Sequence, residues 1–341
     1  MAAPSQPQKA TYDAIVIGAG IQGSFTAYHL AQRHRDTLLL EQFPLPHSRG
    51  SSHGQSRIIR SVYPQECYSR MMPDSFRLWQ RLEAEAGTSL YRRTGLVVLG
   101  PAGDPELEGC RRRLGDNHVL DAAALAQHFP GFRLHAGEVA LLDSSAGVLF
   151  ADRALRAVQE VFRRHGGTLR DGEKVLRIEP GAMVTVTTTA GVYQAPRLII
   201  TAGAWTGALL ETLGLRLPLQ LCHHHGTPTD PEKRDQTPSG ASRPDIALLS
   251  SFISSYLPGL ETQPAVMETC LYTNTPDEDF ILDRHPNFSN IIIGAGFSGH
   301  GFKLAPVVGK LLCELSLGEE PSHSMAPFTI TRFPGVLQAA L

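Results

Sequence analysis

The chain has 341 residues, of which 42% are hydrophobic and 19% are charged, and its formal net charge is −2. This composition is ordinary for a soluble globular protein with one large domain or two smaller ones. The small net charge attracts neither nucleic acid nor an anionic membrane, and no apolar run is long enough to span a bilayer. Five widely spaced cysteines without a C-x-x-C pair argue against a disulfide framework and a structural zinc site. We therefore expect no nucleic-acid partner, no membrane partner and no metal.

The first predicted elements form a β–turn–α–β unit. A short apolar strand over residues 14–17 runs directly into a glycine-rich turn. A helix with an apolar stripe follows over residues 25–33, and a second apolar strand over residues 37–40 ends at Glu41. This order of elements is the context that a dinucleotide-binding glycine pattern requires.

Gly18, Gly20 and Gly23 lie in this turn. Such glycines permit a tight turn and let the backbone approach a pyrophosphate, whose charge lies at the start of the helix. Glu41 follows Gly23 at about the spacing expected for a carboxylate that binds an adenosine ribose. The pattern predicts a dinucleotide site and leaves NAD and FAD open, whereas Glu41 disfavours NADP.

The middle of the chain alternates loops with helices and strands. Residues 48–56, rich in Gly, Ser and His, predict a loop, and so do residues 217–247, rich in Pro, Asp, Thr, Ser and His. Helices are expected over 68–86, 121–128 and 151–165, and strands over 95–99, 174–178, 184–188 and 198–201.

Near the C-terminus, strands are expected over residues 266–272, 280–282 and 291–293, and a helix over residues 305–317. A second glycine cluster at residues 294–301 lies between the last of these strands and the helix. A second nucleotide site would need a following strand and an acidic residue, which are missing. A close approach of the backbone to a flat group explains the cluster better, with the positive end of the helix directed at that group.

Several charged residues are candidates for binding an anion. Arg57 and Arg60 flank an apolar pair just after the glycine- and serine-rich loop. Most arginines are solvated surface residues, but a flavin enzyme acting on an acid needs a planar cation for the carboxylate. Lys303, one of five lysines in the chain, follows the second glycine cluster, and His300 precedes it by three residues. Three consecutive histidines at 223–225 cannot all converge on one metal ion.

Four segments, at residues 13–23, 50–60, 268–273 and 294–303, resemble the monomeric sarcosine oxidase family over nearly the full length of the chain. The resemblance implies an α/β fold, with a Rossmann-type FAD-binding domain interleaved with an α+β antiparallel-sheet substrate domain, as in the D-amino-acid oxidase superfamily. The FAD-binding domain would comprise residues 10–90, 150–215 and 285–320, the truncated substrate domain residues 91–149 and 216–284, and the tails residues 1–9 and 325–341.

The resemblance further implies FAD attached covalently through Cys270. Glu41 would bind the adenosine ribose, and Val175 would lie on the adenine side. Arg60 and Lys303 would bind the substrate carboxylate. The catalytic group would consist of Arg60, Lys303, His300, Tyr272 and His224. The cofactor site would consist of Gly18, Gly20, Ile21, Gln22, Gly23, Glu41, Gln42, Ser51, Ser52, His53, Ser56, Arg57, Val175, Cys270, Gly296, Gly299, Gly301 and Lys303.

The implied activity is FAD-dependent oxidation of secondary α-amino acids, such as sarcosine, L-pipecolate and L-proline-like compounds, to imines. Oxygen would be reduced to hydrogen peroxide. The implied partners are therefore a small-molecule amino-acid substrate and oxygen, and the implied protein is a monomer in the peroxisome. The chain ends in Ala339-Ala340-Leu341, with Ala where a peroxisomal tripeptide has a basic residue, so the cytosol is the alternative.

One departure from the family concerns the substrate domain. Residues 217–222 run almost directly into the three histidines, so a block of substrate-domain strands is missing. The family's oxygen-activating lysine lies a few residues before this position, and here Gln220 stands nearest to it. An FAD-binding but catalytically impaired shortened form is therefore the alternative function. A third reading, an NAD-dependent dehydrogenase, leaves Cys270 and the second glycine cluster unexplained.

Overall fold

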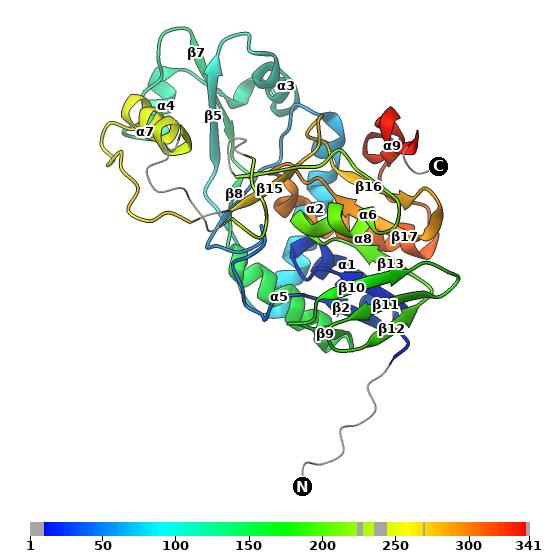
Figure 1. Cartoon of the computed structure of the whole chain (residues 1–341). Coiled ribbons are helices and arrows are strands. Elements are labelled where there is room, and N and C mark those ends of the chain that lie inside the picture. Colours follow the sequence, from blue (N-terminus) through cyan, green and yellow to red (C-terminus); the bar gives the residue numbers. More distant parts are fainter. Residues whose placement is uncertain (1–9, 224–227, 235–243, 269, 339–341) are drawn as a thin grey trace.

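The computed structural model describes residues 10–223, 228–234, 244–268 and 270–338. Its centre is a six-stranded sheet in the order β16–β17–β13–β1–β2–β9 (Figure 1). Neighbouring strands run parallel, except that β16 is antiparallel to β17. The strands are β1 Ala14–Ile17, β2 Thr37–Leu40, β9 Thr168–Arg170, β13 Leu198–Ile200, β16 Ile281–His285 and β17 Phe288–Ala295. Because β1, β2 and β13 are covered on both faces, all their residues except Thr37 are apolar and they do not alternate.

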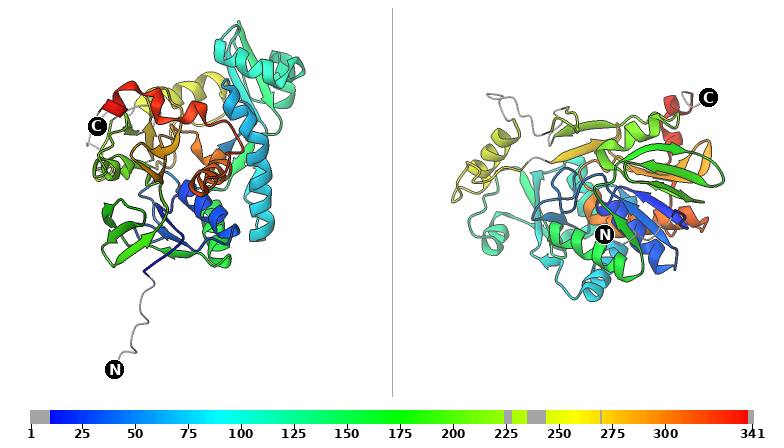
Figure 2. Two further views of the ribbon diagram at one scale, coloured as in Figure 1. Left: turned by 90° about the vertical axis from the view of Figure 1, so that its right-hand side faces the viewer. Right: turned by 60° about the horizontal axis from the view of Figure 1, so that its bottom comes forward.

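Helices cover one face of this sheet. Phe25, Trp79 and Phe162 of these helices form one core with Val16 and Ile199 of the strands. In the left view of Figure 2, α2 extends along one side of the molecule toward the sheet that contains β5. The helices of this layer are α1 Ile21–Gln32, α2 Glu66–Ala86, α5 Ala151–Arg164 and α8 Gly301–Leu317.

A small antiparallel sheet covers the other face. Ile15 of β1 and Ile200 of β13 point to this side and pack with Val184, Val186 and Tyr193 in a second core. The alternation along β1, with Ile15 on one side and Val16 on the other, follows from the pleat of the strand. The elements of this layer are β10 Val175–Glu179, β11 Val184–Thr188 and β12 Val192–Ala195, with η2 Gly203–Trp205 and α6 Thr206–Glu211 after β13.

Three smaller sheets lie beyond this centre. They have the orders β5–β7–β6, β3–β8–β4 and β14–β15, and all their described pairs are antiparallel. The strands are β3 Arg57–Ile59, β4 Tyr91–Arg93, β5 Leu96–Pro101, β6 Val119–Leu120, β7 Glu138–Asp143, β8 Gly147–Leu149, β14 Gln220–His223 and β15 Leu271–Asn274. The helices are α3 Pro105–Leu114, η1 Asp116–His118, α4 Ala122–His128, α7 Pro244–Tyr256, η3 Ala326–Phe328, η4 Ile330–Arg332 and α9 Pro334–Gln338. The predicted α/β fold with an antiparallel second part is confirmed. No helix of the described residues is long and apolar enough to cross a membrane.

Several predicted elements differ from the structure. The loop predicted over 217–247 is wrong at both of its described ends, which contain β14 and the start of α7. The strand predicted over 266–272 begins only at Leu271, because Val266 and Met267 are exposed and pair with nothing in the described chain. Helix α8 begins at Gly301 rather than at residue 305.

The predicted domain limits also need two corrections. The strand β16 begins at Ile281 and pairs with β17, so residues 281–284 lie in the central sheet rather than in the substrate part. Residues 325–338 are not a tail, since Phe328 and Ile330 are buried in the two main cores. The predicted tail over residues 1–9 lies outside the described residues.

Candidate cofactor and substrate site

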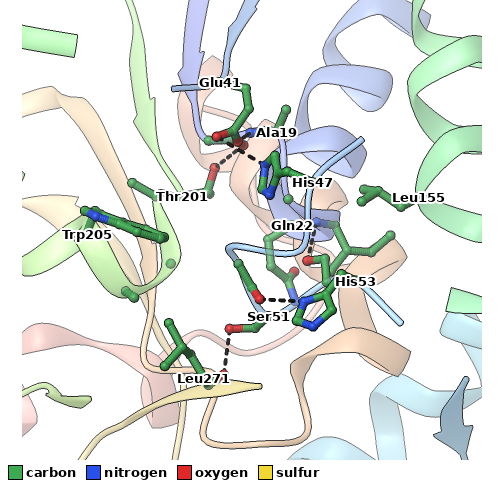
Figure 3. A pocket seen from close by; sticks show the side chains of 18 of the residues that line it. Ala19, Gln22, Glu41, His47, Ser51, His53, Leu155, Thr201, Trp205 and Leu271 are labelled. Atoms are coloured by element: carbon green, nitrogen blue, oxygen red, sulfur yellow. Dashed lines mark hydrogen bonds and ion pairs between the residues drawn. The ribbon is translucent and has the colours of Figure 1, made fainter. Parts of the chain in front are cut away.

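The carboxyl ends of β1, β2 and β13 open onto a cavity of about 1730 Å³. Single small-molecule sites commonly measure roughly 300–1,000 Å³, so this cavity has room for a dinucleotide and a substrate together. Figure 3 shows Glu41 and Ala19 at one end of the cavity and Ser51 and Leu271 at the other. Ligands of open α/β sheets bind at this edge of the sheet.

The glycine turn after β1 forms one wall. Gly18 has φ +98°, and a Cβ there would lie 2.5 Å from the Thr201 carbonyl oxygen. A Cβ at Gly23 would lie 2.0 Å from the Gly18 carbonyl oxygen, so Gly23 serves the packing of α1 and does not line the cavity. Gly20 lines the cavity and precedes α1, which has no side-chain cap. Because the N-cap residue Gly20 has no side chain, a diphosphate can approach the positive start of α1.

Glu41 follows β2 and is nearly fully buried, with 7% of its surface exposed. Its Oε2 accepts a hydrogen bond from the Ala19 amide at 3.0 Å, and its Oε1 accepts one from the Phe43 amide at 3.1 Å. The His47 ring lies 3.4 Å from the same Oε1 (Figure 3). These contacts hold the carboxylate at the cavity wall, where it can accept hydrogen bonds from a ribose diol.

The predicted loop over residues 48–56 forms the next wall. Ser52 Oγ accepts a hydrogen bond from the Ile21 amide at 3.0 Å, so the loop is bound to the start of α1. Ser51 Oγ donates to the Leu271 carbonyl oxygen at 2.6 Å, which binds the loop to β15. His53 Nδ1 lies 2.8 Å from the Gly50 carbonyl oxygen, and burial lowers the pKa of this histidine.

Cys270 lines the cavity beside Arg57. The guanidinium of Arg57 donates to the carbonyl oxygens of Ser51 and His53 at 2.8 and 2.7 Å. The same Nη2 atom lies 3.9 Å from the Cys270 Sγ. The structure therefore joins the two segments whose sequence suggested a flavin environment, with a fixed cation next to the thiol.

Lys303 and Arg60 both lie near the aromatic ring of Tyr63. The Arg60 Cζ is 4.3 Å from the centroid of the Tyr63 ring, and the Lys303 Nζ is 5.8 Å from it. Burial, and then the charges of Arg60 and Arg57, lower the pKa of Lys303 to about 7. The buried Nε of Arg60 has no hydrogen-bond partner among the described residues. Two close cations with an unused donor form a site that an anion would stabilise.

His300 lies behind this pair and does not line the cavity. Its Nδ1 is 3.1 Å from the Ser298 carbonyl oxygen, its ring stacks on Phe280 at 4.5 Å, and its buried Nε2 has no partner among the described residues. Burial lowers the pKa of His300 to about 4, so the imidazole is neutral at neutral pH. Tyr272 lines the cavity, and burial raises the pKa of its hydroxyl.

The structure brings most of the predicted site residues to the cavity, with some exceptions. Arg60 and His300 lie behind the wall, and exposed Ser56 does not line it. His224 lies outside the described residues. The predicted residues that line the cavity are Gly18, Gly20, Ile21, Gln22, Glu41, Gln42, Ser51, Ser52, His53, Arg57, Val175, Cys270, Tyr272, Gly296, Gly299, Gly301 and Lys303.

Sequence reasoning missed other residues of the site. The Tyr63 ring contacts both cations, and its place three residues after Arg60 was the available signal. Trp205 and Glu173 line the cavity beyond the ends of β13 and β9. The carboxyl ends of strands were the available signal for both. Glu232 lies in a segment without strand or helix periodicity, which gave no signal.

The cavity also fits the chemistry of FAD. The turn has no room for a Cβ at Gly18, the N-cap of α1 has no side chain, and the buried Oε1 of Gln22 has no partner among the described residues. At the opposite end, the Arg57 guanidinium lies beside the Cys270 thiol. A dinucleotide with a redox ring is the ligand that uses both ends.

Comparisons with known proteins agree with this geometry. The model of the family described as "DAO: FAD dependent oxidoreductase" matches residues 13–244 and 225–315. Peroxisomal sarcosine oxidase from Homo sapiens is 50% identical over 387 residues, covering 98% of this chain and 99% of the relative. Monomeric sarcosine oxidase from Arthrobacter sp. (strain TE1826) is 30% identical, covering 95% of this chain and 97% of the relative.

Solved structures show the same fold. L-proline dehydrogenase from P. horikoshii has a TM-score of 0.80 at 21% identity and covers 96% of this chain and 99% of that one. Glycine oxidase from Geobacillus kaustophilus has a TM-score of 0.79 at 18% identity and covers 95% and 99%. The solved structures support the fold, whereas the match to the family model and the sequence identity to the two oxidases show the family. The chain belongs to the sarcosine oxidase group of FAD-dependent oxidoreductases.

Proposed function

We propose that this flavin-dependent amino-acid oxidase acts on secondary α-amino acids, such as sarcosine, L-pipecolate and L-proline-like compounds. The observation that carries the proposal is a pair of cations near the Tyr63 ring: Lys303, which lines the cavity as Cys270 does, and Arg60, which lies behind the wall. The names of the sarcosine oxidases to which the chain is similar support the same substrate class.

In this proposal Arg60 and Lys303 bind the substrate carboxylate. Binding an anion would relieve the repulsion that lowers the pKa of Lys303. Tyr272 and Gly299 line the cavity and would surround the amine, with neutral His300 behind the wall, and His224 completes the proposed catalytic group. Bound FAD would supply the redox chemistry: the substrate would lose a hydride from carbon and a proton from nitrogen to give the imine, and oxygen would take up the two electrons and two protons to give hydrogen peroxide. The protein fixes the substrate and stabilises charge.

We further propose that FAD is attached through Cys270. The thiol lines the cavity, and the Arg57 guanidinium lies 3.9 Å from its sulfur. The other cysteines that are described, Cys110, Cys222 and Cys313, are buried, and Cys67 lies in α2 away from the cavity lining.

A second candidate function is a shortened form that binds FAD but turns over slowly. The alignment with the human relative extends over 387 positions, whereas the chain has 341 residues, so at least 46 positions (387 against 341) have no counterpart here. Gln220, the residue nearest to the family's oxygen-activating lysine, is exposed and does not line the cavity. The developing charge on reduced oxygen would lack that counter-ion.

The remaining proposals concern organisation and location. We assign FAD binding to residues 10–90, 150–215 and 285–320, extended to β16, and substrate binding to residues 91–149 and 216–280. Support for a monomer comes from the name of the Arthrobacter relative, and support for the peroxisome from the name of the human one. The tripeptide Ala339-Ala340-Leu341 lies outside the described residues, and the cytosol stays the alternative.

Acid denaturation tests the tether. Protein precipitated in acid should keep its yellow flavin, and Cys270→Ser should release all of it as free FAD. Cys67→Ser is the matched control and should keep the flavin. Covalent flavin in Cys270→Ser would refute the assignment.

Anaerobic mixing tests the substrate class. Sarcosine or L-pipecolate should bleach the flavin absorbance, and air should restore it. Bleaching followed by slow recovery would favour the second candidate, whereas no bleaching by any secondary amino acid would refute the proposed oxidation.

A further inference from the structure

Residues 229–234, called the strap below, run along the cavity between β14 and the loop before β3. Four of them, Thr229, Asp230, Pro231 and Glu232, line the cavity. At its first end the strap is bound to β14, because the Thr229 amide donates to the Leu221 carbonyl oxygen at 3.2 Å. The strap is therefore part of the cavity wall rather than a distant loop.

The second end of the strap is bound to the loop before β3. Arg234 is only 3% exposed, and its Nη1 donates to the carbonyl oxygens of Arg49 and Gly50 at 2.5 and 3.3 Å. Arg49 in turn donates to the Pro231 carbonyl oxygen at 3.4 Å. The strap is thus held at both ends by hydrogen bonds to segments that surround the cavity.

Glu232 adds a third attachment, to the turn after β13. The Trp205 indole Nε1 donates to Glu232 Oε1 at 2.7 Å, and the Arg49 Nη2 lies 3.9 Å from Oε2. The Trp205 ring packs edge-on against Phe43 at 5.4 Å, and Phe43 packs against His47 at 5.2 Å. This row of side chains reaches the wall at Glu41, and in Figure 3 Trp205, His47 and Glu41 lie around the same cavity.

We propose that the strap retains FAD, with Glu232 as the residue that fastens it to Trp205. This inference rests on the proposed function, because FAD must occupy the cavity. The strap contributes two carboxylates, Asp230 and Glu232, to a cavity that receives an anionic diphosphate. The positive charges of Arg49 and Arg234 offset the two carboxylates, so the strap does not repel the diphosphate by a net negative charge. Opening the strap requires the contact between Glu232 and Trp205 to break.

The test measures FAD release from the Cys270→Ser chain, in which a covalent bond cannot hold the cofactor. FAD-loaded protein is diluted, and the recovery of flavin fluorescence gives the dissociation rate. Glu232→Ala should raise this rate about 5- to 10-fold, as expected for the loss of one charge-assisted hydrogen bond. Trp205→Phe keeps an aromatic ring but removes the indole N–H donor, and should act similarly. Lys233→Ala, next to Glu232 in the strap and exposed, is the matched control and should stay within about twofold.

A double variant and a second readout complete the test. Glu232→Ala combined with Trp205→Phe should release FAD no faster than either single variant, since both remove one contact. Bound FAD should also slow tryptic cleavage after Lys233, and Glu232→Ala should abolish that protection. Equal FAD dissociation rates for Glu232→Ala and Lys233→Ala would refute the proposed role of the strap and leave the proposed function unaffected. No FAD binding by the Cys270→Ser parent or by the unmodified chain would overturn the proposed function as well.

Discussion

At the scale of single residues, Lys303 connects the geometry of the site to its pH dependence. Burial and the charges of Arg60 and Arg57 lower its pKa to about 7 in the ligand-free protein, from an ordinary value near 10.5. The ammonium form that binds a carboxylate therefore predominates below pH 7 and is about half present at pH 7. Above pH 7 Lys303 of the ligand-free protein is mostly neutral. Binding of an anion must then be accompanied by uptake of a proton from solvent.

We expect the affinity for a non-oxidisable carboxylate analogue of the substrate to be constant below pH 7. From pH 7 upward it should fall by up to tenfold per pH unit, until the pKa of the complex is reached. Titration of the flavin spectrum with the analogue between pH 5.5 and pH 9 measures this. Lys303→Met should bind more weakly and with a flat profile. A profile that still falls above pH 7 in Lys303→Met would assign the titration to another group.

At the scale of elements, the turn between β17 and α8 places the backbone against Tyr272. Gly299 has φ +77°, and a Cβ there would lie 2.6 Å from the Tyr272 ring. Gly318, the C-cap of α8, has a similar φ of +73° but nothing within 4 Å of a Cβ. The two glycines therefore share the conformational requirement and differ only in the neighbouring ring.

We expect Gly318→Ala to lower the free energy of unfolding by about 1 kcal/mol, through the left-handed backbone alone. Gly299→Ala should lower it by about 2–3 kcal/mol, since the Tyr272 ring must also move. Substrate affinity should fall only in Gly299→Ala. Urea unfolding and substrate titration of the reduced flavin measure the two effects. Equal losses of stability in both variants would show that Tyr272 adjusts freely.

The same scale explains which elements could be predicted from the sequence. The strands β1, β2 and β13 are buried on both faces and, except at Thr37, apolar, so their composition was sufficient. The strand β14 is short, and among the described residues it pairs only with β15. Because the partner residues lie 48 or more positions further along the chain, the pairing leaves no local sequence pattern. The start of α7 was assigned to a loop because Pro and Ser precede it. Phe328 and Ile330 stabilise the last segment through tertiary packing, which composition does not reveal.

At the scale of the whole molecule, the site divides into a part that sequence motifs predicted and a part that they did not. The glycine turn, Glu41, Arg57 and Lys303 are recognisable because each backbone or charge requirement is local, whereas Cys270 was implied only by the family resemblance. The positions of Tyr63, Trp205 and Glu232 depend on which segments meet across the cavity. These contacts between distant segments depend on the order of strands in the sheets and on the course of the loops, which local sequence patterns do not predict.

The whole molecule also determines whether oxygen can be reduced quickly. In the register of β14 with β15, Gln220 lies opposite Asn274 and Leu221 opposite Thr273. Leu221 and Thr273 line the cavity, whereas Gln220 and Asn274 do not. A lysine at residue 220 would therefore point away from the flavin end, although the sequence places it where the family has its oxygen-activating lysine.

We expect flavin reduction by substrate and reoxidation by oxygen to respond differently to a new cation. Gln220→Lys should leave the reoxidation rate within about twofold, because its charge would stay in solvent. Leu221→Lys should raise that rate by about tenfold or more, because a cation in the cavity stabilises charge that develops on oxygen. Stopped-flow mixing of the reduced protein with oxygen measures both, and anaerobic reduction shows whether the substrate site is intact. Faster reoxidation in Gln220→Lys but not in Leu221→Lys would mean that β14 is shifted by one residue when the cofactor is bound, which exchanges the two faces of the strand.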